Sequence, residues 1–183
     1  MKLAGLKKSF DGTCVLDGIN ADLPEHGLVG VAGVSGAGKS TLLRILAGLE
    51  QPDAGRVEGC PERVSVQFED DRLFPWMDVL ANVTLVGCDD AVAVELLESL
   101  GLAGKLHARV EELSGGQRRR AALARALAFP AQVALLDEPT ARLDEESTSL
   151  VLDVVQRRCY DMLVVAATHD KQVIDRCSIV LQI

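Results

Sequence analysis

One glycine-rich stretch carries the residue types that phosphate chemistry requires. It follows the apolar run 28–32, fits the pattern G-x-x-x-x-G-K-[ST] and reads Gly33-Val34-Ser35-Gly36-Ala37-Gly38-Lys39-Ser40, with Thr41 next. The glycines let the backbone wrap around phosphate oxygens with its N–H groups pointing inward, and the helix that begins here adds a favourable dipole. Lys39 can bring a positive charge to the β- and γ-phosphates, and the Ser40 hydroxyl can ligate Mg²⁺. The pattern predicts a nucleotide site in preference to a plain strand-to-helix turn.

A second short sequence offers the start of a helix to an anion. It places a serine and two glycines where a helical pattern begins, and it reads Leu113-Ser114-Gly115-Gly116-Gln117. A serine N-cap and free backbone N–H groups favour an anion at such a point. Taken alone, the same residues fit an ordinary serine N-cap at least as well.

Two carboxylates and one histidine follow apolar runs. Asp137 and Glu138 come at the end of the run 133–136, and His169 follows the run 163–167. Ligands of open α/β sheets bind at the carboxyl ends of the strands. There Asp137 can hold Mg²⁺ through water, and Glu138 can orient and deprotonate an attacking water. Glu138 could instead cap a helix, and a lone histidine is more often structural than functional.

The elements that must position these groups alternate along the chain. Three short apolar runs read as buried parallel strands: 28–32, 133–136 and 163–167. The alternation over 15–23 indicates a further, half-buried strand. Helical patterns occupy 39–47, 114–128 and a segment that begins at Asp144. Strands alternating with helices predict an α/β fold with a mostly parallel sheet.

The middle of the chain has a different character. From Glu69 to Glu112 strand patterns are weak, and apolar residues follow helical spacing up to Gly101. A chain of 183 residues suits one domain. We therefore expect a single domain over 1–183, with its core in 1–68 and 114–183 and a helical subdomain in 69–113.

Composition excludes several classes of protein. An apolar fraction of 48% argues against disorder, and a net charge of −8 argues against nucleic acid as a partner. No apolar run approaches the ~18 residues of a membrane span, and the N-terminus lacks the apolar stretch of a secretory signal. Five scattered cysteines indicate reduced thiols in a cytosolic protein. The run Arg118-Arg119-Arg120 reads as a solvated helix face.

The order of the motifs resembles that of the ATP-binding cassette (ABC) ATPases over nearly the whole chain. After the phosphate loop come Gln67, the serine–glycine sequence 113–117 and the strand end 133–138, followed by 141–144 and 168–170. They look like the family's Q-loop, signature, Walker B, D-loop and switch-histidine motifs. Six matches in one order are far more specific than any one of them.

The resemblance implies a fold and a set of ligands. The fold would be a P-loop NTPase (RecA-like) parallel sheet with a small N-terminal antiparallel β part and an inserted helical subdomain. The cofactors would be ATP and Mg²⁺, with the metal bound by Ser40, Gln67 and Asp137. Phe10 stands near the position of an aromatic that stacks on adenine in the family, and it fits a core position equally well.

The resemblance also implies a dimer. Two cassettes, identical or different, would close head to tail, so that Ser114, Gly115, Gly116 and Gln117 act on ATP bound by the other chain. Asp144 would belong to the D-loop. The catalytic residues would be Lys39, Gln67, Glu138 and His169, with Glu138 as the base and His169 as the sensor of the γ-phosphate.

Transport is the function that this family resemblance favours. The segment 67–76 holds three of the six aromatic residues and looks like a docking surface for a membrane permease subunit, although aromatic residues also form cores. Its D-R-L-x-P-W pattern resembles importers of nitrate, sulfonates and taurine, which implies a peripheral place on the inner membrane face and a solute-binding protein. A soluble cassette for cofactor assembly and a nucleotide-gated module with little hydrolysis are the alternatives.

Some features depart from the family pattern. Arg142 stands where a small or apolar residue is usual, and Val110 stands where a proline often precedes the signature. The chain is short for the family, and after His169 we expect only a short helix and a strand over 179–181. We therefore expect marginal stability that ATP or a partner increases.

Overall fold

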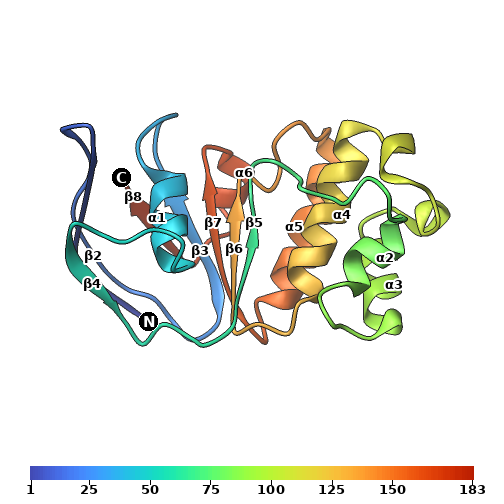
Figure 1. Cartoon of the computed structure of the whole chain (residues 1–183), viewed down its shortest axis with the longest axis horizontal. Coiled ribbons are helices and arrows are strands. Elements are labelled where there is room, and N and C mark those ends of the chain that lie inside the picture. The colour runs from blue at the N-terminus through green and yellow to red at the C-terminus, as the bar shows by residue number, and fades with distance from the viewer.

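The computed structural model describes residues 1–183 and contains two sheets (Figure 1). The smaller sheet is antiparallel, has the order β2-β1-β4 and consists of β1 (Lys2–Phe10), β2 (Thr13–Asp22) and β4 (Ala54–Glu58). The larger sheet is parallel, has the order β5-β6-β7-β3-β8 and consists of β3 (Gly27–Ala32), β5 (Val64–Gln67), β6 (Val133–Asp137), β7 (Leu163–Thr168) and β8 (Ile179–Gln182). The expected α/β class with a parallel sheet and a small antiparallel part is confirmed.

Six helices surround the parallel sheet, and their bounds are α1 (Lys39–Leu46), α2 (Val79–Thr84), α3 (Asp90–Ser99), α4 (Gly115–Ala128), α5 (Glu145–Arg158) and α6 (Lys171–Ile174). Figure 1 shows α1 and the antiparallel sheet on one side, α4 and α5 on the other, and α2 and α3 outermost. Side chains that accept from backbone N–H groups begin four of the helices: Asp78, Ser114, Asp144 and Asp170. None of the helices combines the length and apolar character needed to cross a bilayer.

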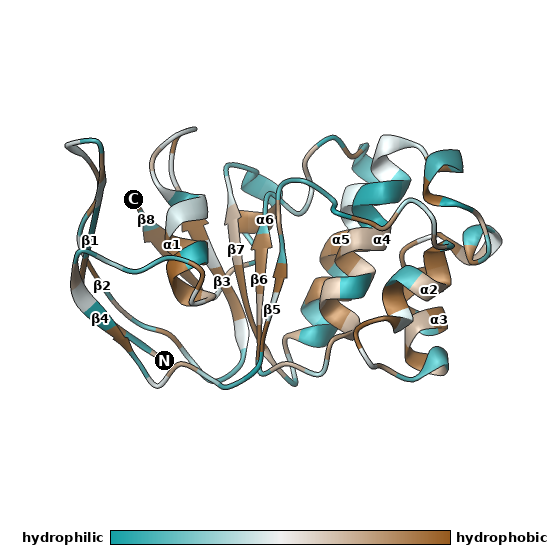
Figure 2. Cartoon of the chain, viewed as in Figure 1, coloured by the Kyte–Doolittle hydropathy of each residue, from teal (hydrophilic) through white to brown (hydrophobic).

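The alternating side chains of the strands divide the core in two. Leu135 and Val165 belong to the hydrophobic cluster shared with α1 and the antiparallel sheet, whereas Leu136 and Val164 belong to the cluster shared with α2 to α5. Figure 2 shows the strongly hydrophobic colouring along the parallel strands between these layers. Because both faces are covered, the strands are almost uniformly apolar.

The elements expected from the sequence lie close to their predicted bounds. The helix expected over 39–47 ends at Leu46, with Ala47 as C-cap and Gly48 at a φ of 69°, and the helix expected from Ser114 has that residue as N-cap. The expected short helix and final strand are α6 and β8. The segment 69–113 contains α2, α3 and two 3-10 turns over 103–105 and 110–112, and its apolar side chains share a cluster with α4 and α5. The boundaries of a helical subdomain stay a prediction.

Candidate active site

The phosphate loop connects β3 to α1 and depends on glycine where the backbone is left-handed. Gly38, the N-cap of α1, has a φ of 102°, and a Cβ added there would lie 2.8 Å from Val15 Cγ1. Lys39 is the first residue of α1 and is only 7% exposed. Its ammonium donates to the carbonyl oxygens of Gly33 at 2.9 Å and Val34 at 3.1 Å. The loop therefore holds a buried cation at the start of a helix, which suits phosphate.

An open cleft of about 700 Å³ adjoins this loop. Its lining combines the phosphate loop with acidic and imidazole side chains: Val15, Val34, Ser35, Gly36, Gly38, Lys39, Ser40, Thr41, Glu69, Asp137, Glu138, Ala141 and His169. The structure thus brings together most of the residues expected at a nucleotide site. Gly33 and Ala37 are in the same loop but are not among the lining residues.

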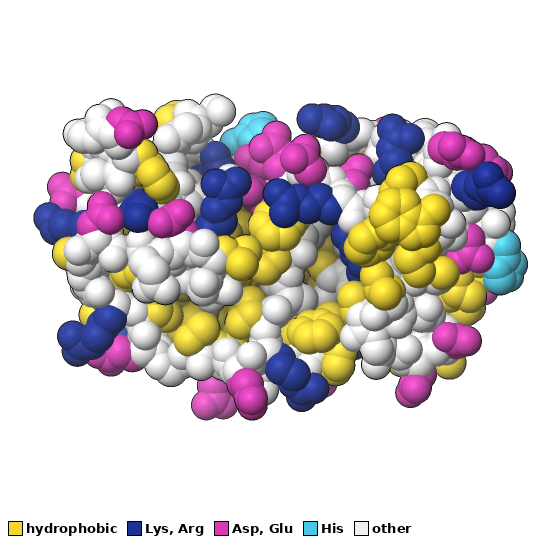
Figure 3. All heavy atoms as spheres, in the orientation of Figure 1, with side chains coloured by type: hydrophobic (Ala, Val, Ile, Leu, Met, Phe, Trp, Pro, Cys, Tyr) yellow, Lys and Arg dark blue, Asp and Glu magenta, His cyan; other side chains and the backbone are white.

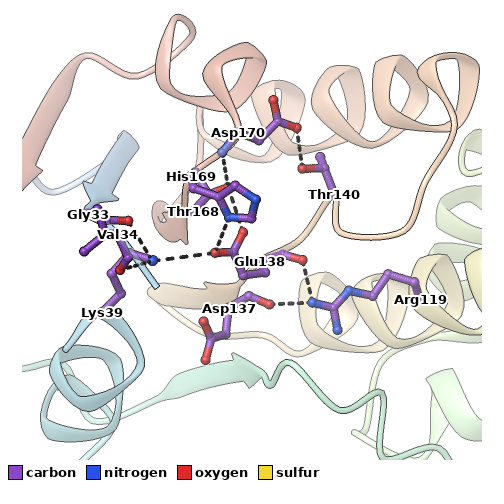
Figure 4. Close-up of polar contacts among 10 residues, drawn as sticks. All are labelled: Gly33, Val34, Lys39, Arg119, Asp137, Glu138, Thr140, Thr168, His169 and Asp170. Carbon is purple, nitrogen blue, oxygen red and sulfur yellow. Dashed lines mark hydrogen bonds and ion pairs between the residues drawn. The ribbon is translucent and has the colours of Figure 1, made fainter. Parts of the chain in front are cut away.

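Glu138 occupies the centre of the polar network in this cleft (Figure 4). Its Oε1 lies 2.9 Å from His169 Nδ1 and 3.8 Å from Lys39 Nζ, and its Oε2 accepts from the Thr168 hydroxyl at 3.1 Å. The Glu138 side chain is 15% exposed, whereas that of His169 is 74% exposed. A carboxylate fixed by these partners and open to one side can orient and deprotonate a water molecule.

The backbone of Glu138 is strained. It has a φ of 50°, in the left-handed region that residues with a Cβ rarely adopt, and such strain costs about 1–3 kcal/mol. Its N–H donates to Ala167 O at 2.8 Å, and its carbonyl accepts from Ala141 N–H at 3.1 Å. The turn at the end of β6 therefore aims the carboxylate into the cleft at an energetic cost.

Asp137 and Ser40 fit a magnesium ion bound together with phosphates. Burial raises the pKa of Asp137, a hydrogen bond with the Ser40 side chain opposes that rise, and the nearby Glu138 and Glu69 add to it. Carboxylate and hydroxyl oxygens are the ligand types that Mg²⁺ prefers, and in phosphate sites the protein supplies only one or two carboxylates. No three His, Cys, Asp or Glu side chains are grouped to hold a metal by themselves. The donor set therefore fits a cation that the substrate helps to bind.

The structure does not bring Gln67 into the cleft. Gln67 is the last residue of β5 and pairs in register with Leu136, whose side chain belongs to the cluster on the α4 side of the sheet. Register partners in a parallel sheet point to the same face, so Gln67 points away from α1 and the phosphate loop. It is 3% exposed, and neither Oε1 nor Nε2 has a hydrogen-bond partner.

Glu69, which no sequence motif indicated, lines the cleft just beyond the end of β5. It follows the carboxyl end of β5 by two residues, and its charge is one of those that raise the pKa of Asp137. A sequence clue was available, because the alternation of Val64, Ser65, Val66 and Gln67 keeps Gln67 inside the strand. Residues beyond the strand end are the ones that reach a ligand.

The arginine run of α4 is not uniformly solvated. Arg119 is 4% exposed, which contradicts the expected solvated face at this position. Its Nη1 donates to Phe68 O at 2.9 Å, Glu69 O at 2.6 Å and Asp71 Oδ1 at 3.2 Å. Its Nη2 donates to the carbonyl oxygens of Asp137 and Glu138 (Figure 4). The reason is geometric, since loop and strand end both turn backbone carbonyls toward this helix.

The signature residues lie outside the cleft of their own chain. Ser114 and Gln117 form a capping box, with Ser114 Oγ accepting from Gln117 N–H at 3.2 Å and Gln117 Oε1 accepting from Ser114 N–H at 2.9 Å. Neither Ser114 nor Gly116 lines the cleft, although Gly115 adjoins a small polar pocket beside Arg119. An action of these residues across a dimer stays a prediction.

The two remaining candidates also lie outside the cleft lining. Asp144 is the N-cap of α5, where its side chain accepts from Ser147 N–H at 2.8 Å, and this hydrogen bond lowers the pKa of Asp144. Phe10 ends β1, is 43% exposed and lies 5.1 Å from the Lys8 ammonium, measured to the ring centroid. An exposed ring is free to stack on a base, so the adenine contact stays a prediction.

An aromatic patch covers the surface beside α2 and α4. Trp76 is 76% exposed, and its ring centroid lies 5.3 Å from that of the partly exposed Phe74. The Arg125 guanidinium lies 6.0 Å from the Phe74 ring. Figure 3 shows a broad hydrophobic area over this part of the molecule. Exposed aromatic pairs next to an arginine are common features of protein interaction surfaces.

Comparison with known proteins identifies the family that this chain resembles. Residues 16–141 match the family described as ABC transporter. An aliphatic sulfonates import ATP-binding protein, SsuB, of Pseudomonas putida is 42% identical over 178 residues, which cover 91% of this chain and 66% of that protein. SsuB 2 of Streptomyces avermitilis is 44% identical over 179 residues, which cover 93% of this chain and 70% of that protein. The chain thus spans about two thirds of the length of these relatives.

Solved structures of similar fold are also ATP-binding cassettes. A dimeric post-hydrolysis state of the ATP-binding cassette MJ0796, bound to ADP and Pi, has a TM-score of 0.87 and 25% identity, covering 100% of this chain and 93% of that one. A second dimeric structure of this cassette, described as a bacterial ABC transporter cassette, has the same TM-score and 27% identity, covering 99% of this chain and 94% of that one.

Proposed function

The chain belongs to the ABC transporter family, and from that premise we propose that it binds and hydrolyses ATP to energise transport through separate membrane subunits. One observation carries the proposal. A single cleft brings the phosphate loop with Lys39 next to Asp137, Glu138 and His169, so the groups for binding phosphate and for activating water face each other.

The chain's own groups perform the binding steps. The N–H groups of the glycine-rich loop and the Lys39 ammonium hold the β- and γ-phosphates. Ser40 and Asp137 would hold Mg²⁺, which supplies neutralisation of phosphate charge when bound. Glu69 lines the cleft and its charge acts on Asp137, whereas Gln67 does not line the cleft, so Glu69 is the better placed neighbour for this cation.

Glu138 is the proposed general base. It accepts a proton from the water that attacks the γ-phosphorus, while His169 and Thr168 fix the orientation of its carboxylate. The exposed imidazole of His169 lines the cleft, and it would contact the γ-phosphate and lose that contact after hydrolysis. Loss of one bound phosphate would then change the interactions at this edge of the cleft.

A second cassette completes the proposed site. Ser114 and Gly116 do not line the cleft of their own chain but present a helix N-terminus to the solvent, which suits the phosphates of ATP bound by a partner. ATP would therefore bind between two chains and favour their association. The dimeric cassettes of similar fold support this arrangement.

The transport role rests on the relatives and on the aromatic patch. The two relatives described above are named as import ATP-binding proteins for aliphatic sulfonates, so we propose a small sulfonate-type solute and a permease that binds around Phe74 and Trp76. The chain would then lie at the inner face of the membrane, and a solute-binding protein would deliver the solute.

Replacing Glu138 by Gln tests the activity. We expect ATP turnover to fall at least about 100-fold, because general-base catalysis contributes about 10²–10⁴-fold. ATP should still bind, and gel filtration with Mg-ATP should show a stable dimer. The control Glu98→Gln changes an exposed carboxylate on α3 and should leave turnover unchanged. Unchanged turnover in the Glu138 variant would reject the assignment of the base.

A further inference from the structure

Arg119 is a buried cation that links two segments remote in the sequence. Its Nη1 reaches Phe68 O, Glu69 O and Asp71 Oδ1, which all belong to the loop after β5. Its Nη2 reaches the carbonyl oxygens at the end of β6. A guanidinium presents five donors in a planar fork, so one side chain can serve both segments from two nitrogen atoms, whereas a lysine has three donors on a single nitrogen.

Each of the two segments that Arg119 links contributes side chains to the cleft. The strand end holds Asp137 and Glu138, and the Glu138 backbone has the left-handed φ of 50°. Such a conformation persists only where the surroundings fix it. The carbonyls that Arg119 binds belong to the strained residue and to the residue before it, so their orientation is set in part by this side chain.

The other segment continues into the exposed aromatic patch. Glu69 lines the cleft, Asp71 pairs with Arg119 at 3.2 Å, and Phe74 and Trp76 follow within the same loop. Arg125, six residues farther along α4, also donates to Asp71 O at 3.0 Å. A displacement of this loop would therefore change the contacts of a side chain that also binds the Glu138 backbone.

We propose that Arg119 is a positioning residue that fixes the backbone of Glu138 and couples it to the loop 68–71. It touches neither substrate nor reacting atoms. It acts through the two carbonyls, and it makes the direction of the Glu138 carboxylate depend on the position of the loop. This role rests on the proposed function only where turnover is concerned, because the coupling itself is a property of the free protein.

Amide hydrogen exchange of the nucleotide-free chain tests the coupling without any assay of activity. In Arg119→Lys, a charge remains but the planar fork is lost, so exchange should rise at least about fivefold in both 68–71 and 137–141. In Asp71→Asn, only the loop partner changes, yet exchange in 137–141 should rise about twofold. If Arg119→Lys does not fold, Asp71→Asn alone tests the coupling.

A matched arginine provides the control. Arg158 Nη2 donates to Leu127 O at 2.9 Å, and Arg158 lies in a pocket that shares no residue with the cleft, so Arg158→Lys removes an arginine–carbonyl contact without touching either segment. It should leave exchange in 68–71 and 137–141 unchanged. If exchange in Arg119→Lys or in Asp71→Asn rises in 68–71 but not in 137–141, the proposed coupling is overturned.

Kinetics then separate positioning from simple destabilisation. In Arg119→Lys, kcat for ATP should fall at least about tenfold while KM stays within about twofold, since Arg119 does not touch the nucleotide. A parallel loss in Arg158→Lys, or a KM change as large as the kcat change, would overturn the positioning role. A wild-type chain without turnover would reject the proposed function, whereas the exchange experiment would still decide the role of Arg119.

Discussion

Two parts of the molecule can be compared: the phosphate-loop half, which contains α1, and the signature half, which contains α4. Their helix N-termini differ in capping, exposure and position relative to the cleft. Each half contains a helix N-terminus that suits an anion, at α1 and at α4. The α1 terminus faces the cleft of its own chain, has no side-chain cap and keeps its cation, Lys39, buried. The α4 terminus is capped by Ser114, is exposed and lies outside that cleft.

The difference predicts which half binds a nucleotide without a second chain. At α1 no side chain caps the helix, and phosphate oxygens would supply the acceptors that a capping side chain supplies elsewhere. At α4 the capping box already satisfies backbone donors, and the helix is stable as it stands. Nucleotide affinity of a single chain should therefore depend on α1, and association of chains should depend on α4.

The largest effect is expected at the phosphate-loop half. Lys39→Ala removes the buried cation and should weaken ATP binding at least about 100-fold, as a lost electrostatic contact to a charged phosphate does. Isothermal titration with Mg-ATP measures this. The control Lys2→Ala, at an exposed position in β1, should bind as the parent does. Equal affinity in the Lys39 variant would remove the functional distinction between the halves.

At the signature half we expect a smaller effect on ATP binding and a selective effect on turnover. Ser114→Asp keeps a good N-cap but places a carboxylate where a partner's phosphate would approach, so turnover should fall about 100-fold with the melting temperature unchanged. ATP binding to the single chain should stay within about threefold. Ser114→Ala removes the cap without adding a charge. It should lower the free energy of unfolding by about 1 kcal/mol and reduce turnover less than Ser114→Asp does. Weaker ATP binding in the Asp variant would contradict an action in trans.

The smallest effect is expected at Gln67. Its buried amide has no hydrogen-bond partner, so Gln67→Leu should raise the free energy of unfolding by about 1 kcal/mol and leave turnover unchanged. Urea denaturation and an ATPase assay measure the two quantities. In the matched variant Glu69→Gln, which changes a side chain of the cleft, Mn²⁺ binding in the presence of ATP should weaken. A loss of turnover in Gln67→Leu but not in Glu69→Gln would show that Gln67 acts in the site.

Short-range chemistry made much of this molecule predictable. The apolar runs that became β3, β6 and β7, the glycines of the phosphate loop and the caps at Ser114 and Asp144 all depend on neighbours in the sequence. The order of the motifs resembled that of a known family, and this resemblance assigned a role to each motif. These parts needed no knowledge of distant contacts.

The parts that were missed depend on which face of an element a residue occupies. Gln67 differs from Glu69 in lying within β5 rather than beyond it, and the run of three arginines hid one buried member. Arg119 shares a helix face with Leu123 at i+4, which is buried, so the spacing held a clue that the charge obscured. The carbonyls that make the burial of Arg119 favourable come from segments far away in the sequence, and no local pattern contains them.

The left-handed backbone of Glu138 also has a consequence for how this chain can change over time. Glycine adopts that conformation without a steric penalty, so selection for folding alone would favour glycine at position 138. A glycine there would bring no carboxylate to the cleft. Drift toward greater thermal robustness and retention of turnover are therefore opposed at this residue, and a laboratory search for heat-resistant variants would be expected to yield inactive ones first at this turn.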